Sequence, residues 1–440
     1  MARPKKKYSE LTKEEVKFLL NKFKIKTVKD IDKSVMKMLR EELKKLKDVR
    51  CKGKIIYKLW DVIICVIVAS LAGCDTWDEI YLFVKSHYDW FKSFLQMTGG
   101  YPTAQSYERI ISLIDSDELN ELLKSFSAKI LVKKFVSTRI YNYDGRINVG
   151  SKRKATLFNE KKPGLNCVNC YSNEYGGCIF TKEIDTKSNE IPAIKEMIEG
   201  LDLLGIVVTW DALNTQTSNV SAVTNAHGDY VVPVKQNQRD LYEALKLYFD
   251  EERQDEIRAG GTDSSYSSMT EKSHGAIIKY EYFQTSDVNW YDRKENWANL
   301  QSFGLVKKTI TKLERVENTR KNAKKKYIEK EVTTVEYRYY ISSLLVDISL
   351  FETATRGHWN VENKVHWHLD FTFRQDANTT TNRKALMNLE IIHKFILHLL
   401  ERVRVRPIYK RYSLKAIRKE LSFNIEENFP EFFVNLLLAN

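Results

Sequence analysis

Three acidic residues stand far apart in the sequence, each within a stretch of regular pattern. Asp144 lies in "TRIYNYDGRINV", Asp211 follows "GIVVTW", and Glu362 lies in "RGHWNVENKVHWHLDFTF". Carboxylate oxygens suit hard cations such as Mg²⁺, which completes its shell with waters and phosphate oxygens. If the three carboxylates converge, they can hold two such ions and act on a phosphodiester.

The two aspartates fall near the ends of predicted strands. Alternation and β-branched residues predict a strand that ends near Gly145, with Asp144 in its C-terminal part. The apolar stretch before Asp211 is typical of a parallel strand buried on both faces. Together with two further strands, "LNCVNCYS" and "GCIFTKEID", and the helices between, residues 138–254 read β-β-β-α-β-α-β-α. This is the order of an RNase H-like mixed sheet, in which the strands of Asp144 and Asp211 are neighbours.

Glu362 lies on a predicted helix with two distinct faces. One polar stripe steps by four residues and consists of His358, Glu362, His366 and Asp370. A separate apolar stripe can pack on the sheet and consists of Val361, Val365 and Leu369. Glu362 is therefore expected at the margin of the core, facing the two aspartates. The flanking histidines could form a metal site with it, but imidazole suits zinc better than magnesium, which favours contacts to phosphate or hydrogen bonds.

Each carboxylate also has an ordinary interpretation. Asp144 could be a turn residue before Gly145, Asp211 could cap the following helix, and Glu362 could be a surface charge. Their joint occurrence at the expected strand ends favours catalysis over three separate structural roles.

Two other features of the sequence, a pair of tryptophans and a pair of cysteines, each have a structural and a functional interpretation. Trp359 and Trp367 are expected to pack in the core rather than to stack on bases. Cys167 and Cys170 form a CxxC, but a strand would point them to opposite faces, which argues against a zinc site.

Composition describes an ordinary globular chain with a basic end. The 440 residues are 43% hydrophobic and 29% charged, enough for two or three domains. Of the net charge of +13, most falls in residues 1–58, which hold 20 Lys and Arg against 8 Asp and Glu. Such an arm indicates a polyanion partner, although a solubilising tail would look similar. Six cysteines and the lack of a long apolar run predict a reduced, cytoplasmic protein with no membrane span.

Five segments are expected along the chain. Within them, Asp75 is expected to cap a helix, and "NTRKNAKKKY" is expected to form a basic hairpin or loop. The segments are a basic helical arm (1–58), a helical domain suited to DNA binding (59–137), the first part of the RNase H-like core (138–254), a β-rich antiparallel insertion (255–350) and a helical completion of the core (351–440).

Several separated blocks, in order, resemble DDE transposases of bacterial insertion sequences, and most closely the H-repeat-associated group. The blocks are "YDGR", "KSNEIPAI", "VVTWDALNTQ", "GDYVVPVKQNQ", "SHGAI", "YYISSL" and "RGHWNVENKVHWHLDFTF". The resemblance runs from about Trp60 to Val403. One departure is that His358 and Leu369 stand where related transposases carry arginine and lysine.

The resemblance implies that Asp144, Asp211 and Glu362 bind two Mg²⁺ ions, which Mn²⁺ would replace. It implies cleavage and strand transfer at the terminal inverted repeats of the chain's own element, joining to target DNA, and a homodimer on DNA. The candidate DNA contacts are Lys235, Gln238, Arg356, His358, Asn363 and His366. Two alternatives stay open: a domesticated DNA-binding protein without catalysis, and a nuclease that cuts without joining.

Overall fold

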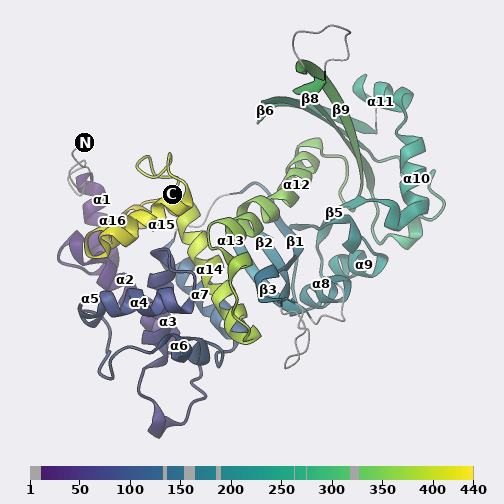
Figure 1. Cartoon of the computed structure of the whole chain (residues 1–440). Helices are drawn as coiled ribbons and strands as arrows, with labels where there is room; N and C mark the ends of the chain where they lie inside the picture. The colour runs from purple at the N-terminus through teal and green to yellow at the C-terminus, as the bar shows by residue number, and fades with distance from the viewer. Residues whose placement is uncertain are drawn as a thin grey trace. The chain divides into compact units, whose positions relative to one another are not determined.

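The computed structural model describes residues 11–131, 136–152, 164–184, 190–261, 263–273, 275–317 and 327–439 (Figure 1). The residues before 11 and the basic loop expected at 318–326 lie outside this part. Within these ranges, no helix has the length and apolar character needed to cross a membrane.

The chain forms two compact units, each assembled from separate stretches. Unit 1 comprises Met1–Val136, Gly145–Lys187 and Val361–Asn440, and unit 2 comprises Ser137–Asp144 and Ser188–Asn360. Each unit draws on several of the five segments expected along the chain.

Unit 1 is mostly helical, as expected for the segments at the start and the end of the chain. The first stretch contains α1 (Lys13–Phe23), α2 (Ile31–Leu43), α3 (Leu59–Leu71), α4 (Trp77–Ser86), α5 (Tyr88–Lys92), α6 (Ala104–Ile111) and α7 (Ser116–Ile130). The last stretch contains α13 (Trp367–Phe371), α14 (Arg383–Val403), α15 (Leu414–Phe423) and α16 (Ile425–Leu437). Both α3 and α14 are buried along most of their length, and they share one apolar core.

The start of α4 differs from the expectation. Thr76, not Asp75, is its N-cap, and it forms a capping box with Glu79. The Asp75 carboxylate instead pairs with the buried Arg418 guanidinium, which also donates to the Ser70 carbonyl at 2.7 Å. Asp75 therefore ties α15 to the helices near the start of the chain.

The strands form the mixed sheet that the sequence predicts, in the order β3-β2-β1-β4-β5-β9-β8-β7-β6. The core strands are β1 (Arg139–Ile147), β2 (Asn166–Ser172), β3 (Gly177–Ile184), β4 (Ile206–Thr209) and β5 (Asp229–Val234). β2 and β3 pair antiparallel, whereas β1, β4 and β5 run parallel. This is an RNase H-like core.

The β insertion is antiparallel, as expected, and it continues the core sheet of unit 2. Its strands are β6 (Ser264–Ser273), β7 (Ala276–Thr285), β8 (Ser302–Glu317) and β9 (Tyr327–Ser342). β9 pairs with β5, Val231 opposite Ser342, so the insertion joins the core directly. The helices of unit 2 are α8 (Glu190–Glu199), α9 (Thr217–Asn225), α10 (Arg239–Tyr248), α11 (Glu251–Arg258) and α12 (Ile348–Val361), the last of which ends at the boundary with unit 1.

Candidate active site

The register of β1 and β4 indicates where Asp144 and Asp211 lie relative to each other. Asn142 lies opposite Thr209 in this parallel pair. Asp144 and Asp211 each follow these partners by two residues, so continuing the same register puts the aspartates at one level and on one face. Neighbouring strands are about 4.8 Å apart, which suits two carboxylates that share a cation.

The Asp211 carboxylate is held in a fixed orientation. It caps the short helical turn at Ala212–Asn214, and its Oδ1 accepts from the Asn214 backbone nitrogen at 3.2 Å and side-chain Nδ2 at 2.6 Å. Asp211 is therefore a cap, but of this short turn and not of the following helix α9, whose N-cap is Gln216. This capping is compatible with metal binding, because both of these bonds use the same carboxylate oxygen.

Asn214 connects Asp211 to a further carboxylate. Its Nδ2 also donates to Glu190 Oε2 at 3.3 Å, from the first residue of α8. Asn214 is fully buried, so its amide has little freedom to turn away. Glu190 lies in the block "KSNEIPAI", but it does not belong to the triad expected from the sequence.

Replacing Asn214 with alanine is expected to loosen Asp211 without removing it. Partners that orient a metal ligand contribute about 10- to 100-fold in metal affinity, so about tenfold more Mg²⁺ should be needed for half-maximal DNA cleavage. Asn225→Ala, at an exposed residue of α9, is the matched control. A Mg²⁺ titration that superimposes on that of the wild type would contradict the role given to Asn214.

Two side chains after β5 hold the loop that follows Asp211. The Asn237 amide donates to the Ala212 carbonyl at 2.7 Å, and the Gln238 amide donates to the Thr215 carbonyl at 3.0 Å. Gln238, expected as a DNA contact, thus has a structural partner in this loop. Lys235 is exposed, which is compatible with the contact expected for it.

Glu362 opens a π-helical turn rather than lying in a regular α-helix. The turn spans Glu362–His366, in unit 1, between α12 and α13. π turns are rare and often mark functional sites. Glu362 and Asn363 are exposed. The side chain of His358 lies outside the described part of the chain.

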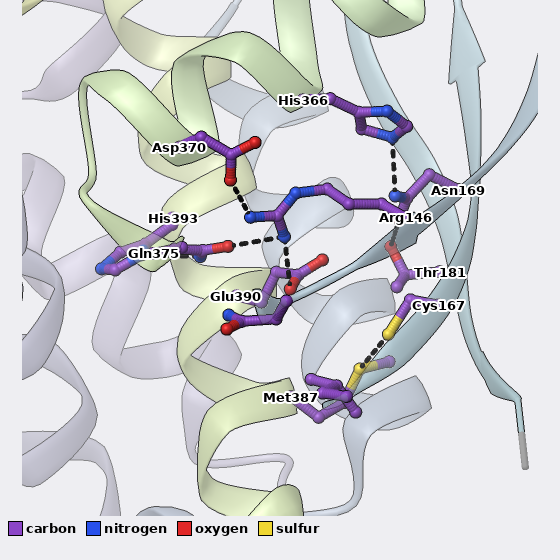
Figure 2. A network of polar contacts seen from close by, with 12 residues as sticks. Arg146, Cys167, Asn169, Thr181, His366, Asp370, Gln375, Met387, Glu390 and His393 are labelled. Carbon is purple, nitrogen blue, oxygen red and sulfur yellow. Dashed lines mark hydrogen bonds and ion pairs between the residues drawn. The ribbon is translucent and has the colours of Figure 1, made fainter. Parts of the chain in front are cut away.

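The apolar stripe of this segment is confirmed, but the polar stripe is not. Val361, Val365 and Leu369 are buried. His366 and Asp370 are partly buried and each contacts a polar network in unit 1, whereas Glu362 is exposed (Figure 2 shows the network).

The centre of this network is Arg146, two residues after Asp144 on β1. Its buried guanidinium donates to Gln375 Oε1 at 3.0 Å, to Glu390 Oε2 at 3.1 Å and to the Asp370 carboxylate (Figure 2). Burial raises the pKa of Asp370, and the guanidinium only partly offsets that effect. An arginine in such a fork holds the helix segment after Glu362 to the end of β1.

The network continues from Glu390 towards β2. Lys394 lies 2.6 Å from Glu390 and donates to Asn169 Oδ1, also at 2.6 Å. Burial alone would raise the pKa of Glu390, but Lys394 and Arg146 lower it to about 2, so the carboxylate is charged. The Asn169 amide donates to His366 Nε2 at 3.1 Å. His366 is also partly buried, and this hydrogen bond occupies its Nε2.

Arg356, another expected DNA contact, has partners within unit 2. Its guanidinium lies 3.2 Å from the Glu271 carboxylate and 5.3 Å from the centre of the Tyr280 ring. These contacts fasten α12 to β6 and β7.

Asp144 thus lies on β1 and Asp211 in the turn that follows β4, both in unit 2, whereas Glu362 belongs to unit 1. Among the described residues, no three His, Cys, Asp or Glu side chains are grouped to hold a metal ion. The joint metal site of the three carboxylates therefore stays a prediction.

Sequence comparisons identify the group of proteins to which the chain is related. Residues 147–400 match the family described as "Transposase DDE domain", and residues 40–127 match "DDE_Tnp_1-associated". The first match includes Asp211 and Glu362, while Asp144 lies just before it.

Two relatives and one solved structure show what the chain is similar to. The "Putative transposase YncI" of Escherichia coli O157:H7 is 28% identical over 354 residues, covering 80% of this chain and 84% of the relative. The "H repeat-associated putative transposase YhhI" of Escherichia coli K12 is 27% identical over 341 residues, covering 78% and 84%. The piggyBac transposase synaptic complex with hairpin DNA aligns with 94% of this chain and 80% of its own at 12% identity, but its TM-score of 0.36 is too low to support an argument.

The resemblance noted in the sequence is thereby confirmed at the level of the family. The transposase domain match spans more than half of the chain, and relatives named after the H repeat align with most of it. The protein belongs to the DDE transposase family, in its H-repeat-associated group.

Proposed function

We propose that the protein cleaves phosphodiesters at the ends of an insertion sequence and transfers the freed strand to target DNA, with divalent metal ions. The observation that carries this proposal is the parallel register of β1 and β4, which pairs Asn142 with Thr209 and, continued by two residues, would bring Asp144 level with Asp211. In a DDE transposase, two carboxylates so placed are suited to hold cations beside a scissile phosphate.

The donor set fits magnesium. Asp144 and Asp211 offer hard carboxylate oxygens, which suit magnesium. The described hydrogen bonds of the Asp211 carboxylate both use the same oxygen, Oδ1. Glu362 would complete the site, since it is exposed and follows unit 2 by two residues along the chain. Bound ions would activate a water or a 3′-hydroxyl and stabilise the leaving oxygen.

The residues of the chain have separate tasks in this proposal. Asn214 orients Asp211, Asn237 and Gln238 fix the loop beyond it, and Arg146 positions the segment after Glu362. DNA with terminal inverted repeats is the substrate, Lys235 and Asn363 are exposed candidates for contacting it, and two copies of the chain would act on the two ends.

Metal removal gives the direct test. Wild-type protein with labelled inverted-repeat ends and a supercoiled target should yield nicked and joined products in Mg²⁺ or Mn²⁺, and none after chelation by EDTA. DNA binding in EDTA, measured by gel shift, is the control that the protein remains folded.

Three results would redirect the proposal. Cleavage without joined products would favour the nuclease, and binding without cleavage would favour the DNA-binding protein. Cleavage that survives EDTA would contradict the metal site itself.

A further inference from the structure

Two large aromatic side chains lie exposed on the segment that follows Glu362. Trp367 is 50% exposed and Phe371 is 54% exposed, one turn apart on α13. Their rings stack with centroids 4.6 Å apart and an angle of 22°. The expectation that Trp367 packs in the core is therefore wrong. Exposed apolar side chains that lie together, rather than singly, are candidates for an interaction site.

The surface next to this aromatic pair is basic. Lys415, on α15, places its Nζ 5.4 Å from the centre of the Phe371 ring. Residues 402–419, which include most of α15, hold eight Lys and Arg and no Asp or Glu. Some of these basic side chains form ion pairs within unit 1. Arg418, for example, pairs with Asp75. The exposed members are Lys410, Arg411, Lys415 and Lys419.

The chemistry of this surface selects the partner. Protein–protein interfaces are depleted of lysine at their centres, so clustered lysines beside the rings disfavour a second protein. Aromatic rings combined with positive charge are what single-stranded nucleic acid requires, because bases stack on the rings while phosphates meet the cations. Bases in a duplex already have both faces covered, so the exposed part of these rings suits an unpaired base.

We propose that Trp367 and Phe371 form a stacking site for an unpaired nucleobase, with the phosphates on the exposed lysines of residues 402–419. The site adds to the proposed function, since it assigns a DNA contact to residues outside the acidic triad. It rests on DNA being the substrate, and it needs no metal and no catalysis.

The test compares two DNA probes in EDTA, so that cleavage plays no part. One is a blunt inverted-repeat duplex, and the other carries an extrahelical 2-aminopurine near the same end. Wild-type protein should bind the second probe more tightly and quench its fluorescence. Trp367→Ala should lose about tenfold in affinity for that probe only, within the range for one stacked base. Trp367→Phe should restore most of the affinity and quenching.

Tyr337→Ala is the matched control. Tyr337 is 41% exposed and has Lys307 at 5.6 Å from its ring, but it lies on β9 of unit 2. Equal losses for both probes, or no loss in Trp367→Ala, would overturn the stacking site. A shift of Trp367→Ala to a smaller oligomer in light scattering, with base preference unchanged, would instead assign the surface to a protein partner. If the wild type binds neither probe, the proposed function fails first.

Discussion

Asp211→Asn is expected to abolish cleavage while leaving the fold intact. Asparagine caps helices as well as aspartate does, so the bonds from Asn214 to the side-chain oxygen can persist. The neutral amide cannot replace a carboxylate in holding a cation. Losing several kcal/mol of the transition-state stabilisation that the metal ions supply makes the cleavage reaction about 10³-fold slower. The measurement is the single-turnover cleavage rate of labelled ends in Mg²⁺.

Two companion variants separate capping from catalysis. Asp211→Ala should lose the same activity and a further ~1 kcal/mol of stability, because it also removes the cap. Asp250→Asn changes another capping aspartate, whose side chain accepts from the Arg253 backbone nitrogen on α11, and it should cleave at the wild-type rate. If Asp211→Asn retains wild-type activity, Asp211 is only a cap and the proposed metal site is wrong.

Arg146→Ala is expected to cause the largest loss of stability. The guanidinium is 5% exposed and joins Asp370 to Glu390. Removing one partner of a buried ion pair leaves uncompensated charge and costs about 3–5 kcal/mol. Lys394 still neutralises Glu390, so the lower end of that range is expected. Urea unfolding gives the loss, and hydrogen exchange of the α14 amides locates it in unit 1.

Arg139→Ala is the control for this prediction, because Arg139 lies on the same strand but is exposed. Its substitution should cost no more than about 1 kcal/mol. Arg146→Lys should fall between the two, since lysine keeps the charge but cannot form the planar fork. If Arg146→Ala is no more destabilising than Arg139→Ala, the network has no structural importance.

The strands that carry Asp144 and Asp211 could be predicted because their patterns are local. β-branched alternation marked β1, and a continuous apolar run marked β4 as a buried parallel strand. β6 cannot be predicted in this way, because "SSYSSMTEKS" has few apolar residues. Its position depends on pairing along the whole length of β7, which no local pattern records.

The segment around Glu362 could be predicted only in part. A four-residue step assumes α-helical geometry, whereas a π turn takes in an extra residue and rotates the side chains beyond it. Trp367 consequently lies exposed, and Asp370 reaches Arg146. The contacts of Arg146 and Asn214 were also missed, because their partners lie far away in the chain or behind a turn.

The composition of unit 1 from separate stretches has a consequence during protein synthesis. Helix α3 packs on α2, α4 and α6, which are made with it, but the part of its surface that meets α14 stays uncovered until α14 is made, some 310 residues after Leu71. At 5–20 residues per second, the ribosome needs roughly 15–60 s to supply α14. During that interval the nascent chain exposes part of a nearly wholly apolar helix, "LWDVIICVIVASL", to the surrounding solution. Expression at low temperature or with added chaperones should therefore raise the yield of folded protein.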